Sequence, residues 1–218
     1  MKIGDIKREA RQSLKNRWGF AVLLTIVVFA VYVLVPFFVE VILSGGFPQW
    51  LNEDKGWPVV VSQILTLLLT PVTIGYCWVF LQLLRKEPVQ IKSAFQLFSG
   101  RWYWKSLGLT ILVAIYTFLW SLLFIIPGII KSIAYSQAYY ILKDHPDYSL
   151  NQIITESRKM MNGYKWKFFL LELSFIGWAI LSIITMGIGL LWLVPYIYST
   201  LAKFYEEVSQ KREEAPQL

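Results

Sequence analysis

Long apolar runs, separated by short basic and polar segments, dominate the pattern of this chain. Residues 20–39 hold no charged side chain, and four later runs hold one between them, Glu172; these runs cover residues 59–84, 106–130, 168–186 and 188–202. A helix needs about 20 apolar residues to cross a bilayer core about 30 Å thick. The pattern therefore predicts an all-α protein embedded in a membrane.

The limits of these runs predict a polytopic bundle of six transmembrane helices in three hairpins, within a single integral membrane domain. The expected spans are residues 18–43, 58–85, 103–125, 127–143, 166–186 and 188–206. Residues 44–57 form a longer outer loop, whereas Pro127-Gly128 and Gly187-Ile188-Gly189 predict tight outer turns in the other two hairpins.

A short amphipathic helix is expected before each hairpin, because apolar residues recur there at helical spacing. The three apolar faces consist of Ile3, Ile6, Ala10 and Leu14, then Ile91, Ala94, Phe95 and Phe98, then Leu150, Ile153, Ile154 and Met161. Each helix ends at a small or polar residue before an aromatic one, in "LKNRWGF", "FSGRWYW" and "MNGYKWKFF". Trp18, Trp102 and Trp166 are expected as anchors at headgroup depth. Three divergent units follow, residues 1–88, 89–146 and 147–218.

The basic residues predict the orientation and the partners. Nineteen of the 21 Lys and Arg residues lie in the N-terminal segment, the two loops between hairpins with their flanks, and the tail. By the positive-inside rule, these segments and both termini are cytoplasmic. The net charge of +7 therefore points to anionic lipid headgroups rather than to nucleic acid.

The interfacial helices carry the candidate headgroup ligands, because each Lys or Arg near an anionic surface contributes about 1 kcal/mol. The candidates are Lys7, Arg8, Arg11, Lys92, Arg158 and Lys159. The alternative is that these helices only anchor and orient the hairpins.

The second helix of each hairpin is richer in polar residues than the first. Thr66, Thr70 and Thr73 lie on one stripe of the second span, and Lys131, Tyr135 and Tyr139 form a row on the fourth. Hydroxyl groups allow close helix packing and interhelical hydrogen bonds in lipid. We therefore expect the second helices at the centre, with Lys131 facing the interior. The intramembrane candidates for polar contacts or a ligand are Lys131, Glu40, Glu172, Tyr135, Tyr139, Gln137, Thr70 and Thr73.

Two charged residues within these spans have alternative interpretations. Lys131 either snorkels to the outer interface, pairs with Glu40, or serves a ligand or ion. Glu172 is either solvated or hydrogen-bonded between helices, or it is a protonated carboxyl near Tyr139 or Tyr140 that takes part in proton coupling.

Motifs for catalysis are missing from the sequence. No Ser or Cys nucleophile is placed with a base, and no phosphate-binding glycine loop or metalloprotease motif occurs. Asp144, His145 and Asp147 resemble metal ligands, but Pro146 marks a helix stop and turn there. We predict a protein that is not an enzyme and has no metal and no cofactor.

Several segments resemble the DUF975 family of bacterial integral membrane proteins, whose function is unknown. They are "REARQSLKNRWGFAV", "IPGIIKSIAYSQAYYILKDHP", "ESRKMMNGYKWKFFLLELSFIGWAILSIITMGIGLLWLVPY" and "AKFYEEV". The resemblance implies a location in the bacterial plasma membrane, and some relatives are associated with protection against membrane-active bacteriocins. A more distant likeness to the membrane domains of some glycerophosphodiester phosphodiesterases brings no catalytic residue.

The expected function is to bind or shield membrane lipid or membrane-active peptides, as an immunity or envelope-protection protein. The partners would be anionic lipids, and in addition a membrane-active peptide or another membrane protein. The alternative is a small transporter or flippase with a polar path along the second helices. Internal repeats favour transporters, but those folds usually have paired or inverted halves rather than three parallel units.

Overall fold

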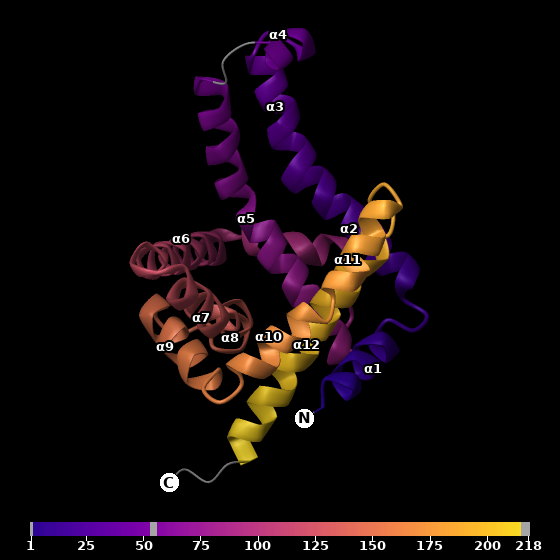
Figure 1. Ribbon diagram of the computed structural model, residues 1–218, viewed down its shortest axis with the longest axis vertical. Coiled ribbons are helices and arrows are strands. Elements are labelled where there is room, and N and C mark those ends of the chain that lie inside the picture. Colours follow the sequence, from indigo (N-terminus) through magenta and orange to yellow (C-terminus); the bar gives the residue numbers. More distant parts are fainter. Residues whose placement is uncertain (1, 53–55, 215–218) are drawn as a thin grey trace.

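The computed structural model describes residues 2–52 and 56–214, and this part of the chain is helical with no β-strand. The all-α prediction is therefore confirmed. The molecule is elongated: α3, α4 and the first half of α5 project at one end, whereas α1 and the C-terminal end of α12 lie toward the other (Figure 1).

Fourteen helical elements follow one another in the described residues. They are α1 (Ile3–Ser13), α2 (Trp18–Phe29), the π-helix η1 (Ala30–Leu34), α3 (Val35–Leu43), α4 (Phe47–Asn52), α5 (Trp57–Leu84), the 3-10 helix η2 (Ile91–Phe98), α6 (Gly100–Leu123), α7 (Ile125–Tyr135), α8 (Ala138–Asp144), α9 (Leu150–Met160), α10 (Lys165–Leu173), α11 (Ile176–Ile184) and α12 (Leu190–Glu214).

Four segments of the described chain are long and apolar enough to cross a membrane. They are Trp18–Leu43, Trp57–Leu84, Gly100–Leu123 and Lys165–Ile184. The expected spans at 127–143 and 188–206 are not among these segments of sufficient length and hydropathy. The first is divided at Ser136 and Gln137 into the short helices α7 and α8, and the second belongs to α12, which becomes charged from Lys203 onward.

Proline divides two of these long segments into parts with different surroundings. A π-turn, η1, lies just before Pro36, where the proline cannot donate a backbone hydrogen bond. In α5, Pro71 separates a largely exposed first half from a second half buried in the core. α5 packs against α3, α12, η2 and α8. Its first half contacts α3 through Ser62, and its second half contacts α12 through Tyr76 and η2 through Gly75.

The centre of the molecule is built around α5 and α12. Phe80, Phe204 and Tyr205 are among its largest fully buried side chains, and α12 contacts α1, α2, α5, α9 and α11. By contrast, α6 exposes many apolar residues, including Phe118 and Leu122. α5 and α12, which the sequence predicts to be the second helices of the first and third hairpins, therefore occupy the central position.

The sequence predicts interhelical hydrogen bonds for the threonine stripe of α5, but the three hydroxyls donate within their own helix. The hydroxyls of Thr66, Thr70 and Thr73 donate to carbonyl oxygens of their own helix, at Ser62, Thr66 and Thr70, over 2.8, 3.3 and 2.8 Å. A hydroxyl on a helix readily finds the carbonyl one turn earlier. The hydrogen-bonding capacity of the three hydroxyls is therefore used within α5, and the side chains are only partly buried.

The breaks that follow α1, η2 and α9, the helices expected to lie at the membrane interface, share one backbone feature. Asn16, Gly100 and Gly163 have φ values of 63°, 42° and 79°. This left-handed conformation ends a helix and redirects the chain, and glycine and asparagine adopt it most readily. The structure thus repeats the same kind of break at each of the three predicted positions.

Two tight hairpins are packed with the same spacing of serine and glycine. A Cβ atom on Gly189 would lie 2.7 Å from Oγ and 3.0 Å from Cα of Ser182, and one on Gly128 would collide with Ser121. The two glycines each follow their serine by seven residues. The absence of a side chain lets α11 approach α12, and α6 approach α7.

Candidate functional site

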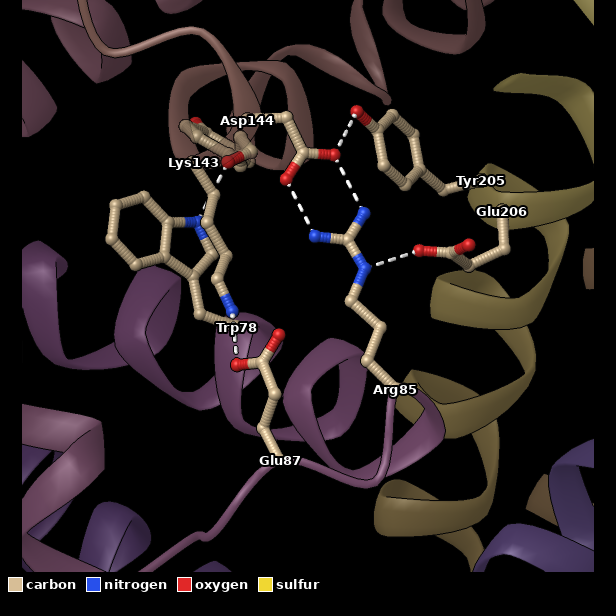
Figure 2. A network of polar contacts seen from close by, with 8 residues as sticks. Trp78, Arg85, Glu87, Lys143, Asp144, Tyr205 and Glu206 are labelled. Carbon is tan, nitrogen blue, oxygen red and sulfur yellow. Dashed lines mark hydrogen bonds and ion pairs between the residues drawn. The ribbon is translucent and has the colours of Figure 1, made fainter. Parts of the chain in front are cut away.

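A polar cluster joins the C-terminal ends of α5 and α8 to α12 (Figure 2). Arg85 follows α5, and its Nη1 and Nη2 donate to Oδ1 and Oδ2 of Asp144, each over 2.7 Å. Its Nε donates to Oε1 of Glu206 over 2.6 Å. One planar guanidinium is therefore shared by two carboxylates from two other helices, a geometry that arginine provides and lysine does not.

Further contacts support this cluster from both sides. The hydroxyl of Tyr205 donates to Oδ2 of Asp144 over 2.7 Å, and its ring stacks on Tyr140 with centroids 5.1 Å apart. Lys143 forms an ion pair with Glu87 over 3.5 Å. Tyr205, Lys143 and Glu87 are also drawn in Figure 2.

A tryptophan fixes the start of α8 against α5. Nε1 of Trp78 donates to the carbonyl oxygen of Tyr139 over 2.7 Å, and the ring of Trp102 packs edge-on against Trp78 with centroids 5.4 Å apart. Trp102, which the sequence predicts as an anchor at headgroup depth, thus packs against the buried Trp78 from the start of α6.

The charges of the cluster are matched to one another. Burial would raise the pKa of the Asp144 carboxyl, but the hydrogen bonds from Arg85 and Tyr205 outweigh burial and hold that pKa below its ordinary value. The hydrogen bond to Asp144 raises the pKa of Arg85 further above its already high value. Both groups remain ionised at neutral pH, so the cluster holds helices together rather than exchanging protons.

Arg85, Tyr205 and Glu206 are not among the predicted site residues, although the sequence holds a signal for this cluster. Arg85, Asp144 and Glu206 each lie at or just beyond the end of an expected second span. The first two occur in the related motifs "RKEP" and "KDHP". The sequence offers Asp144 as a possible metal ligand with His145 and Asp147, although a helix stop and turn is the preferred interpretation. In the structure His145 stacks on Tyr148 with ring centroids 4.5 Å apart, and Asp147 lies 3.9 Å from Arg101.

Lys131 and Glu40 lie in separate surroundings. Nζ of Lys131 lies 4.1 Å from the centroid of the Trp120 ring, and its side chain is partly exposed instead of facing the bundle interior. Glu40 accepts hydrogen bonds from Trp50 Nε1 over 2.8 Å and from Ser62 Oγ over 2.6 Å. Among the described residues, no ion pair joins Lys131 to Glu40. Lys131 therefore contacts the ring of Trp120, whereas the sequence predicts that it faces the polar interior of the bundle.

The other intramembrane candidates are divided between the core and the surface. Tyr135 and Gln137 are buried, and Nε2 of Gln137 donates to Oγ of the neighbouring Ser136 over 2.7 Å. Tyr139 is partly buried beside Trp78. Glu172 lies on the exposed side of α10.

The candidate headgroup ligands mostly point away from the protein. Arg8, Arg11, Lys92, Arg158 and Lys159 are exposed. Arg8 pairs with Asp5 over 3.0 Å, and Lys159 with Glu156 over 2.8 Å, both on their own helices.

Lys7 departs from this pattern. Its Nζ donates to the carbonyl oxygen of Ser174 over 3.3 Å and lies 4.0 Å from the centroid of the Phe175 ring. Burial lowers the pKa of Lys7. Lys7 therefore holds α1 against the joint between α10 and α11.

A basic hollow of about 450 Å³ opens beside the polar cluster. Its charged lining residues are Glu9, Lys15, Arg17, Lys86, Glu87 and Lys203. Glu9 pairs with Lys203, and Glu87 with Lys143. Within the described chain, no ion pair is formed by Lys15, Arg17 or Lys86. The hollow therefore presents net positive charge at its surface.

The chain matches a known family along most of its length. The family described as "Protein of unknown function (DUF975)" matches residues 1–133 and 122–212. No curated protein and no solved structure matches the chain.

Proposed function

This chain belongs to the DUF975 family, and from that premise we propose that it is a non-catalytic membrane protein that binds anionic lipid and shields the membrane from membrane-active peptides. The proposal places it in the bacterial plasma membrane. Its lipid-binding surface consists of the basic faces of α1, η2 and α9.

One observation carries this proposal. All three of these helices bury apolar residues and expose basic ones. Their buried residues include Ile6 and Ala10 in α1, Ala94 and Leu97 in η2, and Ile153 and Ile154 in α9; their exposed cations are Arg8, Arg11, Lys92, Arg158 and Lys159. A basic face on a helix parallel to the membrane attracts anionic headgroups.

The proposed topology has six spans and both termini in the cytoplasm. The four long apolar helices supply four crossings. The combined α7 and α8 segment and the apolar first part of α12 would supply the other two, shielded by their neighbours. α1, α9 and the C-terminal end of α12 lie toward one end of the molecule, remote from α4, and this supports a common side for both termini (Figure 1).

Leakage from proteoliposomes tests the shielding function. Vesicles of phosphatidylglycerol and phosphatidylethanolamine would hold a trapped dye and be challenged with a cationic membrane-active peptide. We expect the wild-type protein to slow leakage and the variant Lys92→Gln, Arg158→Gln, Lys159→Gln to slow it less. The loss of three surface cations weakens lipid attraction by about 1 kcal/mol each.

A matched control removes the same charge elsewhere. The variant Lys165→Gln, Lys167→Gln, Lys211→Gln leaves α1, η2 and α9 unchanged and should protect as well as the wild type. Equal leakage from empty vesicles and from vesicles with the wild-type protein would contradict the shielding function.

A second candidate is a small transporter or flippase, and one observation favours it. Oε1 of Gln137 and the hydroxyl of Tyr140 are buried, and neither has a hydrogen-bond partner among the described residues. Buried polar atoms with spare hydrogen-bonding capacity are suited to a ligand or to water. Solute uptake into proteoliposomes that is lost in Gln137→Leu, while the protein remains folded, would favour transport over shielding.

A further inference from the structure

A groove of about 300 Å³ lies between α1, the start of α2 and the α11–α12 hairpin. Its walls include the aromatic rings of Trp18, Trp178, Trp192 and Tyr196 and the side chain of Leu181. The side chains of Trp178, Leu181 and Trp192 are each about half exposed, at 57, 51 and 49%. In a membrane this open apolar side would face the acyl chains.

One charged side chain, Arg11, stands among the described residues of the groove lining. Its Cζ lies 5.9 Å from the centroid of the Tyr196 ring, which places the guanidinium at the α1 end of the groove. No carboxylate of the described lining opposes it. The groove is thus positive at one end and apolar along its length.

The α1 end of the groove is held in place by polar contacts. The hydroxyl of Tyr196 donates to the carbonyl oxygen of Lys7 over 3.4 Å, and the hydroxyls of Ser13 and Ser199 lie 2.9 Å apart. These bonds connect α1 to α12 on either side of Arg11 in the sequence. The guanidinium is therefore presented from a fixed helix.

The length of the groove suits the upper part of an acyl chain. Gly189, the residue just before α12, and Tyr196 on α12 are both lining residues, and about seven residues of helix rise by about 10 Å. A ligand with its charge at Arg11 would extend its apolar part along Trp192 and Trp178 toward Gly189.

We propose that this groove binds one anionic phospholipid of the cytoplasmic leaflet, with its phosphate at Arg11 and an acyl chain along Trp178 and Trp192. An arginine guanidinium matches the phosphate group in charge and in hydrogen-bonding geometry. The inference rests on the proposed lipid-binding function and assigns it a specific site.

Native mass spectrometry of the full chain in detergent tests this site by titration with phosphatidylglycerol or with zwitterionic phosphatidylcholine. We expect the first phosphatidylglycerol to bind at least about fivefold more tightly than phosphatidylcholine, because a cation near anionic lipid contributes about that factor. Arg11→Gln should remove the preference. Lys211→Gln, which removes the same charge outside the groove and outside the lipid-binding faces of α1, η2 and α9, should retain it.

A second pair of variants tests the apolar part. Leu181→Trp fills the groove and should abolish the first binding event for both lipids, whereas Ile183→Trp, on the exposed surface of the same helix, should not. Equal binding of the first lipid by these two variants would overturn the site. So would equal binding by Arg11→Gln and the wild type.

Fluorescence keeps the proposal testable if Leu181→Trp does not fold. One phosphatidylglycerol brominated in its acyl chain should quench the wild-type protein, and Trp192→Phe should reduce that quenching more than Trp104→Phe, which lies outside the groove and is 70% exposed. Equal quenching in these two variants would overturn the site. The two hypotheses fail in different ways. If Leu181→Trp no longer binds the first lipid but still protects vesicles from leakage, the shielding function does not depend on this groove. If the wild-type protein binds the first lipid tightly but does not slow leakage, the shielding function is contradicted and the groove site is not.

Discussion

Arg85 and Asp144 are joined by two parallel hydrogen bonds of 2.7 Å, so the end of α5 is fastened to the end of α8 across 59 positions of sequence. Arg85 also binds Glu206 of α12. This arrangement brings together residues at the ends of the three expected second spans, 58–85, 127–143 and 188–206. One guanidinium thus connects three segments that lie far apart in the sequence.

The substitution Asp144→Asn should destabilise the protein by about 2–3 kcal/mol, because it weakens hydrogen bonds between charged groups and leaves Arg85 with one carboxylate. Thermal unfolding of the purified protein in detergent measures this as a lower Tm. Asp147→Asn provides the control in the same loop, since the Asp147 side chain is 91% exposed. Equal Tm values for the two variants would contradict a stabilising role of the cluster.

The contribution of Asp144 should depend on pH in a definite direction. Its pKa in the folded protein is below the ordinary value of 3.8, so the folded state binds the proton less readily than the unfolded state. The stabilisation is therefore fully present above the unfolded pKa and is lost as the pH falls through the folded pKa. We expect the Tm difference between wild type and Asp144→Asn to be constant from pH 7 to about 5 and to shrink below about pH 4. A Tm difference that grows as the pH falls would contradict a lowered pKa of Asp144 in the folded protein.

Gly189→Ala should destabilise the α11–α12 hairpin by about 1–3 kcal/mol, because its Cβ atom would lie 2.7 Å from Ser182 Oγ. Gly177→Ala, on α11, has no neighbouring atom within 4 Å of the added Cβ atom. That control should change stability by less than about 1 kcal/mol, toward greater stability, because alanine favours helix. Thermal unfolding of both variants distinguishes close packing from general helix preference.

Lys131 and Trp120 should be energetically coupled by about 0.5–1 kcal/mol, as expected for a cation above an indole ring. A double-mutant cycle with Lys131→Met and Trp120→Leu measures this coupling through the free energy of unfolding. Strictly additive effects would argue against the contact. Loss of solute uptake in Lys131→Met, with stability retained, would instead support the transporter alternative.

Local features of the fold were predictable because they depend on neighbouring residues. The apolar runs at 18–43 and 58–85 correspond closely to Trp18–Leu43 and Trp57–Leu84. The breaks before Trp18, Trp102 and Trp166 coincide with left-handed residues, because glycine and asparagine adopt that backbone conformation most readily. Hydropathy does not reveal that the expected span 127–143 is interrupted at Ser136 and Gln137, or that the expected span 188–206 is the first part of the longer helix α12.

The candidate site was less predictable because its residues come together only through packing. The sequence alone determined the helical class, the alternation of apolar and basic segments, and the positions where the chain turns. These features depend on hydropathy and on backbone preference, which act over a few neighbouring residues. Tertiary structure alone decided that Arg85 is bound by both Asp144 and Glu206, and that Lys131 rests on Trp120 and not against Glu40. Which charged group meets which is set by the angles and registers at which helices pack, and these depend on contacts between residues far apart in the chain.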